Sequence, residues 1–206
     1  IVSNTQQAPA GLVAAYGFEE GAGSSVADTS GNANNGTISG ATWVNNGKFG
    51  NALSFDGVDD RVIVPDAATL DFGSALTLEA WVYPTTLTGW RTVMLKEVPG
   101  ELAYALYAHD NAPRPAGYVR IGASSPAVTG TAALPLNTWT HLAMTYDGIT
   151  LRLYQNGTQV GSRALSGSLT ASALPLQIGG SALWGEYFAG RIDEVKLYLA
   201  RAAAAR

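Results

Sequence analysis

Closely spaced turn dipeptides divide this chain into short segments, and they constrain its fold more than any other feature. Asp147-Gly148 and Asn156-Gly157 supply the positive backbone angles that tight β-turns require. Apolar, β-branched and aromatic residues flank both dipeptides. Residues 140–159 therefore predict a strand, a turn, a second strand, a second turn and a short third strand. A further dipeptide, Asp56-Gly57, predicts another turn of this kind.

Short apolar or alternating segments recur along the rest of the chain, and each ends at a turn signal. No segment has a sustained helical period with a cap, which argues against a parallel α/β sheet. So many strands exceed what one open sheet usually carries. The predicted fold is all-β, a two-sheet antiparallel jelly-roll sandwich. The eleven predicted strands are 12–18, 52–55, 62–64, 76–83, 92–96, 103–108, 118–121, 138–146, 151–155, 174–178 and 192–198.

Composition excludes several classes of function. The chain has no cysteine, so it has no disulfide framework, no thiolate nucleophile and no cysteine-ligated zinc. The net charge of −4 gives no electrostatic reason to bind a polyanion, and we expect no nucleic acid partner. Turn residues interrupt every apolar run well before the roughly 20 residues that a spanning helix needs, so we expect no membrane span.

The domain organisation is predicted to be simple. The chain shows no internal repeat, and residues 11–199 are expected to form one domain. Residues 1–10 indicate a linker or a processed N-terminus, and residues 200–206 a short alanine-rich tail. Residues 20–40, rich in glycine and asparagine, are the one extended region predicted to be irregular. Loops of that length are usually functional or tied down.

Several strings, taken in order, resemble the laminin G-like modules of the concanavalin A-like lectin and glucanase superfamily. The resemblance covers residues 12–198 and implies a jelly roll with one convex and one concave sheet. It also implies a secreted or extracellular module that binds glycans or proteins. The main strings are Leu12-Val13-Ala14-Ala15-Tyr16-Gly17-Phe18-Glu19-Glu20-Gly21-Ala22-Gly23, Gly50-Asn51-Ala52-Leu53-Ser54-Phe55-Asp56-Gly57, Leu76-Thr77-Leu78-Glu79-Ala80-Trp81-Val82, Trp139-Thr140-His141-Leu142-Ala143 and Gly190-Arg191-Ile192-Asp193-Glu194-Val195-Lys196-Leu197-Tyr198.

The glycine-rich segment carries a dense set of hard oxygen ligands, which suit calcium. The resemblance implies a structural calcium ion between this N-terminal loop and an aspartate of the last strand, which corresponds to Asp193. The predicted calcium ligands are Asp28, Ser30, Asn32, Asn35 and Asp193. Alternatively, Asp28 and the asparagines are ordinary turn formers, and Asp193 is a paired polar residue.

Aromatic side chains and a few polar groups offer a sugar-binding site on the concave sheet or its rim. The predicted ligand-binding residues are Trp90, Arg91, Tyr107, Arg120, Trp184 and Tyr187; Tyr104, His109, Tyr118 and Glu186 lie in the same two regions of the sequence. Trp90 and Trp184 adjoin glycines, which is unusual for core tryptophans, although each could instead cover the core as a lid. Trp81 and Trp139 are predicted to be packing residues.

Catalytic signatures are absent from the sequence. Glucanases of this superfamily place their carboxylates on one strand as a Glu, Asp, Glu alternation, so that all of them share a face. None of the seven glutamates belongs to such a pattern. The chain has two histidines, of which His141 is expected to be half-buried and structural. The acidic group Asp56, Asp59 and Asp60 indicates a turn more than a second metal site.

These features together predict a noncatalytic carbohydrate-binding module of a secreted or cell-surface protein. Its expected ligand is a polysaccharide or other glycan, and its role would be to bring a polysaccharide-active enzyme to its substrate. We expect a monomer that contacts neighbouring domains of a parent protein. The alternative is a structural or adhesive spacer that contacts protein.

Overall fold

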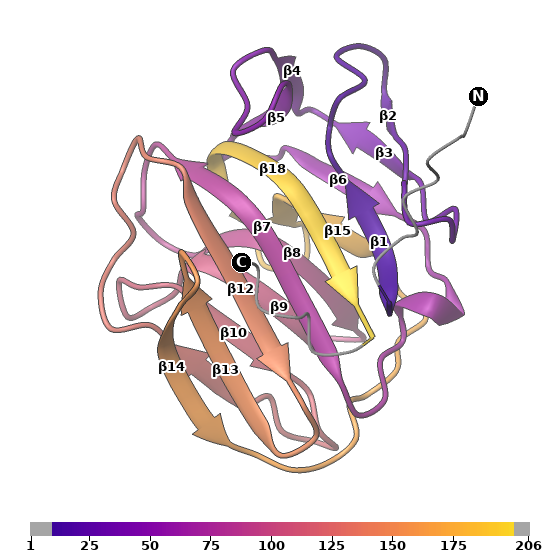
Figure 1. The fold of residues 1–206 in the computed structure, drawn as a ribbon, viewed down its shortest axis with the longest axis vertical. Coiled ribbons are helices and arrows are strands. Elements are labelled where there is room, and N and C mark those ends of the chain that lie inside the picture. Colours follow the sequence, from indigo (N-terminus) through magenta and orange to yellow (C-terminus); the bar gives the residue numbers. More distant parts are fainter. Residues whose placement is uncertain (1–9, 200–206) are drawn as a thin grey trace, which may run out of the picture.

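A computed structural model of the chain describes residues 10–199 and shows two antiparallel sheets of eight strands each. Residues 1–9 of the predicted linker 1–10 and the predicted tail 200–206 lie outside the described residues. Sheet A contains, in order, β14 (Thr158–Ala164), β13 (Thr150–Gln155), β12 (Thr140–Tyr146), β7 (Leu76–Pro84), β18 (Ala189–Tyr198), β5 (Ala52–Asp56) and β4 (Thr42–Val44), with β1 (Leu12–Tyr16) also paired to β18 (Figure 1).

Sheet B forms the second layer of the sandwich. It contains, in order, β11 (Ala127–Thr129), β10 (Ala116–Val119), β9 (Glu101–His109), β8 (Arg91–Val98), β15 (Leu176–Ile178), β6 (Arg61–Val64), β3 (Gly36–Ser39) and β2 (Ser25–Val26). A two-stranded hairpin of β16 (Gly180–Ser181) and β17 (Glu186–Tyr187) and one 3₁₀ turn (Ala68–Leu70) complete the described elements. The sandwich predicted from the turn pattern is confirmed.

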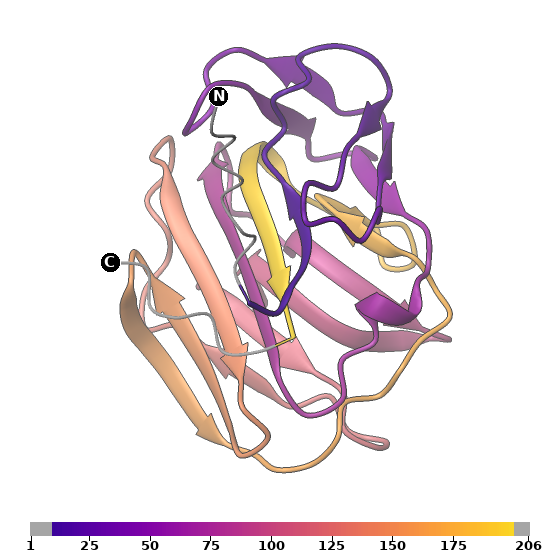
Figure 2. The same ribbon diagram turned by 45° about the vertical axis from the view of Figure 1, so that its right-hand side comes forward.

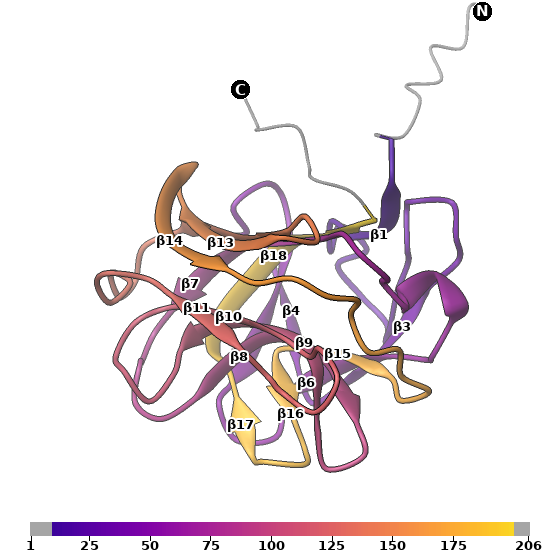
Figure 3. The same ribbon diagram turned by 90° about the horizontal axis from the view of Figure 1, so that it is seen from below.

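The main hydrophobic core lies between the two sheets, which are seen nearly edge-on in Figure 3. In β7, Leu78, Ala80 and Val82 point inward and are fully buried. Trp81 and Tyr83, which alternate with them, are only half-buried, as a period of two requires for a strand with one outer face.

The predicted meander is present as β12, β13 and β14, which pair in that order. Its second turn depends on Asn156, which adopts a positive φ of 50°. The Asn156 side-chain Oδ1 accepts a hydrogen bond of 2.9 Å from the backbone N–H of His141. The turn dipeptide therefore reverses the chain and also anchors it to the first strand of the meander.

The prediction that residues 20–40 are irregular is wrong. This segment contains β2 and β3, and β3 pairs with β6. A Cβ atom on Gly36 would lie 2.6 Å from Val62, so the close approach of β3 requires glycine there. Glycine and short polar residues gave no alternating pattern that could reveal these strands. The N-terminal strands gather at one end of the sandwich (Figure 2).

A β-bulge in β18 changes which residues face outward. Asp193 pairs with Trp81 and Lys196 pairs with Glu79, so β18 contains one residue more than β7 between these pairs. Glu194 lies within this bulge and has a positive φ of 51°. Asp193 thus faces the outer side of sheet A, where the connection between β4 and β5 covers it. Among residues 10–199, no helix is long and apolar enough to cross a membrane.

Candidate ligand-binding surface

A second, smaller hydrophobic cluster lies on the outer face of sheet B, away from the main core. Tyr107 of β9 pairs with Ala116 of β10, and both side chains belong to this cluster. Tyr104 has the opposite orientation: it is buried in the main core, and its hydroxyl donates to the Leu70 carbonyl at 3.1 Å. Of the two β9 tyrosines singled out in the sequence, only Tyr107 therefore belongs to the outer face.

Three aromatic rings meet at this cluster. The centroid of Trp90 lies 5.0 Å from that of Tyr107 and 6.0 Å from that of Tyr118, and the two tyrosine rings are 5.6 Å apart. Edge-to-face contacts of this kind stabilise aromatic groups beyond the area they bury. Tyr107 is buried, whereas Trp90 and Tyr118 remain partly exposed. The rings form a fixed platform with two of its members reaching the surface.

Two carboxyl groups adjoin this platform and accept hydrogen bonds from its hydroxyls. Tyr107 donates to Glu186 Oε2 at 3.0 Å, and Tyr118 donates to Asp110 Oδ2 at 3.4 Å. Burial raises the pKa of both carboxyl groups, because desolvation disfavours the charged form. We call Trp90, Tyr107, Asp110, Tyr118 and Glu186 the aromatic–carboxylate cluster.

Unpartnered polar atoms concentrate beside this cluster. Four buried side-chain polar atoms of the described residues lack a hydrogen-bond partner, and three of them are Arg91 Nε, Thr92 Oγ1 and Asp110 Oδ1. Thr92 pairs with Tyr107 across β8 and β9. Asp110 is only 4% exposed. These three atoms are enclosed by protein, so an enclosed water, and not a ligand bound at the surface, would complete their bonding.

The β16–β17 hairpin borders the aromatic–carboxylate cluster and projects from sheet B on the side away from sheet A (Figure 3). Arg91 holds its second strand, because Nη1 donates to the Tyr187 carbonyl at 2.7 Å. The tip of the hairpin exposes two large apolar side chains, Leu183 at 49% and Trp184 at 39%. Arg91 thus has a positioning role, and Trp184 lies at the rim and not over the core.

The structure divides the six predicted ligand-binding residues. Trp90 and Tyr107 pack together, Arg91 holds the backbone of Tyr187, and Trp184 is exposed at the tip of the hairpin, but Arg120 does not join them. The Arg120 backbone is bonded to Ala103, about 13 Å along β9 from Tyr107 at ~3.3 Å per residue. Its guanidinium lies 3.4 Å from Glu101. Sequence reasoning missed Asp110, because neither periodicity nor motif indicates which loop carboxylate folds back into a sheet face.

Trp81 and Trp139, predicted to be packing residues, pack against other side chains outside the main core. Both lie half-buried on the outer face of sheet A, where cationic side chains cover rings. Lys48 Nζ lies 4.1 Å from the Trp81 ring centroid. Arg191 Cζ lies 4.0 Å from the centroid of Tyr83, whose ring packs 5.5 Å from Trp139. These cation–π pairs occupy ring faces that a sugar would need.

In the predicted calcium-binding loop, the Asp28 carboxylate already accepts hydrogen bonds from other groups of the protein. Asp28 Oδ1 accepts from the N–H groups of Ala15 and Ser30, and Oδ2 accepts from Ser30 Oγ and the Asn34 N–H, at 2.8–3.0 Å. These four donors fill the four lone-pair positions of the carboxylate. Asn35 Oδ1 accepts from the Asp28 N–H. Asp28 therefore does not fit a calcium ion.

Ser30 and Asn32 are also engaged by the protein. Ser30 Oγ, whose single hydrogen is directed at the Asp28 carboxylate, lies 2.9 Å from the Val13 carbonyl, and Asn32 Nδ2 donates to this carbonyl at 3.0 Å. The Asn32 side chain thus fastens the loop to β1. This bonding matches the alternative in which Asp28 and its neighbours are turn formers.

Asp193 lies elsewhere and has a different environment. Its side chain is fully buried; Oδ2 accepts from the Phe49 N–H at 3.0 Å and Oδ1 accepts from the Glu194 N–H at 2.7 Å, and the Lys48 N–H is a further backbone donor to this carboxyl. Burial raises the pKa of Asp193 to about 6. Glu19 lies on the other side of the same turn and accepts from the Asn51 N–H at 3.2 Å. Three backbone N–H donors against four lone-pair positions leave one position of the Asp193 carboxyl open.

An oxygen-rich depression of about 360 Å³ adjoins this turn and is lined by Gly21, Trp43, Val44, Asn45, Asn46 and Asn51. Gly47 lies beside both the Asp193 carboxyl and the Asn51 carbonyl. A Cβ on Gly47 would lie 3.0 Å from Asp193 Oδ2 and 2.2 Å from the Asn51 carbonyl oxygen. Amide, carbonyl and carboxylate oxygens are the ligands that calcium prefers.

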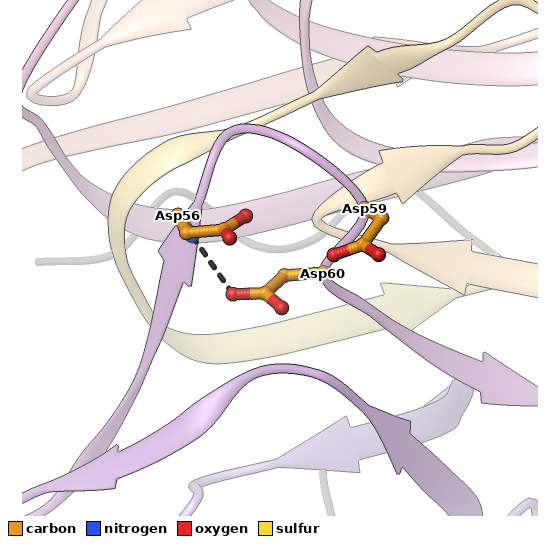
Figure 4. A group of neighbouring side chains, drawn as sticks. All are labelled: Asp56, Asp59 and Asp60. Atoms are coloured by element: carbon orange, nitrogen blue, oxygen red, sulfur yellow. Dashed lines mark hydrogen bonds between the residues drawn. The ribbon is translucent and has the colours of Figure 1, made fainter.

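A separate acidic group occupies the turn between β5 and β6. The carboxylates of Asp56, Asp59 and Asp60 gather within 4.8 Å of one another (Figure 4). Asp60 Oδ2 accepts from the Asp56 N–H at 2.8 Å, and Asp56 Oδ1 accepts from the Val58 N–H at 2.8 Å. These bonds shape the turn itself, as the Asp-Gly dipeptide predicts.

Solved structures with this fold include several binding domains. Domain 4 of AbnA, an extracellular GH43 arabinanase from Geobacillus stearothermophilus solved with arabinotriose, superposes with a TM-score of 0.73 at 24% identity and covers 92% of each chain. The binding domain of Paraclostridial Mosquitocidal Protein 1 gives a TM-score of 0.75 at 16% identity, over 95% of this chain and 50% of the other. The binding domain of botulinum neurotoxin DC, solved with SialylT, gives 0.68 at 11% identity, over 94% of this chain and 49% of the other. At these identities the likeness shows the fold alone.

Sequence relatives identify the family. Pappalysin-1 from Mus musculus is 42% identical over 65 residues, which are 29% of this chain and 4% of that protein. The chain thus corresponds to a small part of that relative. A family model, Laminin_G_3, matches residues 56–203 and is described as the concanavalin A-like lectin/glucanases superfamily. The match extends over most of the sequence, and the chain belongs to this laminin G-like family of the concanavalin A-like lectin/glucanases superfamily.

Proposed function

We propose that the protein is a noncatalytic carbohydrate-binding module that uses the outer face of sheet B. The observation that carries this proposal is the aromatic–carboxylate cluster. Sugar sites combine aromatic faces, which stack on pyranose or furanose rings, with a few fixed polar groups that bind hydroxyls. Trp90 and Tyr118 offer partly exposed ring surface, and the half-buried Glu186 offers a hydrogen-bond acceptor, while the buried Asp110 holds the Tyr118 hydroxyl in place.

A solved structure of the same fold supports a carbohydrate-binding role. The AbnA domain of the same fold belongs to an extracellular arabinanase and was solved with arabinotriose. By analogy, this module would be extracellular and would bring a polysaccharide-active enzyme to its substrate. Because the chain spans about half of the toxin binding-domain structures it matches, their partners are not carried over.

A glycan array with single-residue variants tests the proposal. We expect the wild type to bind at least one glycan and Trp90→Ala or Tyr118→Ala to weaken that binding about tenfold or more, because truncating a stacking ring removes ~1.4 kcal/mol or more. Trp139→Ala is the matched control, since it removes a half-buried tryptophan from the outer face of the other sheet and should leave binding unchanged.

Two results would contradict the proposal. One is no binding to any glycan on the array, which would favour the structural or adhesive spacer. The other is glycan binding that Trp139→Ala weakens and Trp90→Ala does not, which would place the site on sheet A. Circular dichroism of each variant checks that the sandwich remains folded.

We also propose a structural calcium ion at Asp193. Asp28 is not among its ligands in this proposal, because its lone pairs are already filled. The supporting observations are the buried Asp193 carboxyl with one open acceptor position, Glu19 across the turn, and the adjoining depression lined partly by asparagines. The ion would neutralise Asp193 and order the connection between β4 and β5. We expect calcium to raise the melting temperature and Asp193→Asn to abolish that rise.

A further inference from the structure

A depression of about 360 Å³ lies beside β4, the strand that ends sheet A on one side (Figure 1). None of its six lining residues is charged, and the fully buried Asp193 is not one of them. The aromatic–carboxylate cluster lies on the other sheet. This depression, which we call the β4 depression, is therefore separate from both sites proposed above. It is lined by Gly21, Trp43, Val44, Asn45, Asn46 and Asn51.

Trp43 gives the β4 depression a fixed aromatic wall. It is half-buried and packs against the main core, and its Nε1 donates to the Gly23 carbonyl at 2.8 Å. Both contacts hold the indole in one orientation before any ligand arrives. A ring that is already ordered loses little conformational entropy when a ligand packs against it.

Side-chain amides supply the polar part of the wall. Asn45 and Asn46 are exposed, and neither side-chain amide makes a hydrogen bond among residues 10–199. The Asn46 backbone carbonyl accepts from Arg191 Nη1 at 2.7 Å, which holds the main chain and leaves the side chain free. Asn51 Nδ2 donates to the Glu19 carbonyl at 3.2 Å, and its Oδ1 stays available. A free amide offers two N–H donors and an acceptor oxygen, which suits hydroxyl groups, because a hydroxyl both donates and accepts.

The size of the β4 depression limits what it can hold. Pockets for small ligands span ~300–1,000 Å³, and this one lies near the lower end of that range. Gly21 adds no side chain, and a Cβ there would lie 3.1 Å from Asn51 Nδ2, so a larger residue would occupy space beside this amide. A depression of this size fits one sugar ring and not a long stretch of polysaccharide.

We propose that the β4 depression is a second carbohydrate site, which holds one sugar residue at the end or at a side branch of a glycan. The sugar packs against Trp43, and its hydroxyls bond to the amides of Asn45, Asn46 and Asn51. No residue of the aromatic–carboxylate cluster takes part, so this inference goes beyond the proposed function and stands apart from it. A glycan that reaches both sites would bind more tightly than either site alone allows, because the second contact becomes intramolecular.

NMR titration of the ¹⁵N-labelled protein with single sugars tests this inference. The probes are L-arabinose, D-galactose, D-glucose, D-mannose and L-fucose, each added at constant calcium so that only the sugar changes. We expect at least one of them to cause saturable shifts at millimolar concentrations. The shifted signals should be the Trp43 indole N–H and the side-chain and backbone amides of Asn45, Asn46 and Asn51.

The Asn45→Ala/Asn46→Ala double variant removes the free amides and leaves the fold intact, because both side chains are exposed and the Asn46 backbone carbonyl is kept for Arg191. We expect it to weaken sugar binding about tenfold or more, since two hydrogen-bonding groups are lost. Gln159→Ala is the matched control. It truncates an exposed amide on β14, the strand at the opposite edge of sheet A, and should leave the titration unchanged.

The position of the shifts separates this inference from the proposed function. Shifts at the β4 depression that the double variant loses and Gln159→Ala keeps support the second site. Shifts confined to Trp90, Tyr118 and Glu186 overturn it and support the proposed function alone. Shifts at the depression that the double variant retains in full also overturn it. If no probe shifts the signals of the depression, the second site is wrong, and binding to the glycan array still decides the proposed function.

Discussion

At the residue scale, side chains of one type behave differently because their neighbours differ. Asp28 and Asp193 were both predicted to bind calcium. Asp28 receives four protein hydrogen bonds, whereas Asp193 is fully buried with three backbone donors and has its pKa raised to about 6. Asp110 is also buried, and its Oδ1 is enclosed by protein atoms. The residue type fixes which bonds a side chain can make, and the number of nearby donors determines how many of its acceptor positions remain open.

His141 provides a pH-dependent prediction at the same scale. Burial lowers the pKa of His141, and Lys196 lowers it further, against the opposing effect of Glu79, whose Oε2 lies 3.7 Å from Nε2. The unfolded chain, with a histidine pKa of ~6.5, then binds this proton more readily than the fold does. The stability that His141 contributes is therefore complete above pH ~6.5 and is lost as the pH falls toward its folded pKa.

NMR titration measures this effect directly, since the chain has two histidines and a His109→Gln variant assigns the signals. We expect the His141 midpoint to lie below ~6.5. The melting temperature of His141→Gln should fall less steeply than that of the wild type between pH 7.5 and 5.5. A His141 midpoint above the unfolded value would show that the Glu79 carboxylate dominates and would contradict this prediction.

At the element scale, the β16–β17 hairpin depends on contacts from other strands. It has two residues in each strand, too few to be stable alone. Arg91 of β8 reaches two carbonyls and a hydroxyl, and Tyr107 of β9 bonds to Glu186. The hairpin that bears Trp184 is therefore positioned by sheet B.

Arg91→Lys tests this dependence. A lysine ammonium lacks the planar fork that serves several acceptors at once. We expect amide hydrogen exchange in residues 180–188 to become about tenfold faster, in keeping with the loss of a charged hydrogen bond worth ~1.5–3 kcal/mol. Exchange in the meander should be unchanged. Arg163→Lys, which alters a single bond to the Ala127 carbonyl, is the control, and equal protection of the hairpin in both variants would show that Arg91 does not position it.

At the scale of the whole molecule, the Asp193 turn joins distant parts of the chain. Phe49, between β4 and β5, donates to Asp193 in β18, 144 residues away. An ion held there binds the folded state alone and stabilises all of it. At free calcium 100 times its Kd the gain is ~2.7 kcal/mol, or about 5–10 °C in melting temperature for a domain of this size.

Differential scanning calorimetry with calcium and with chelator checks this prediction. Asp193→Asn should lose the calcium-dependent rise, while Asp59→Asn, in the exposed acidic turn, should keep it. An identical melting temperature for the wild type in calcium and in chelator would contradict the calcium proposal. A rise that Asp59→Asn abolishes and Asp193→Asn retains would move the ion to the β5–β6 turn.

The sequence by itself determined the all-β class and the meander of β12 to β14, because turn dipeptides and alternation with a period of two are local properties that survive without tertiary context. The family followed from a separate feature, the resemblance of several ordered sequence strings. The sequence also indicated Trp90 and Tyr107 as residues of the candidate ligand-binding surface. Only the tertiary structure decided that β3 pairs with β6, that Trp81 faces outward beneath Lys48, that Arg120 stands apart, and that Asp110 joins the aromatic rings. The physical reason is that these features depend on bulges, strand register and contacts between residues far apart in the chain. No local pattern of residue types encodes which of several loop carboxylates ends up desolvated against a sheet.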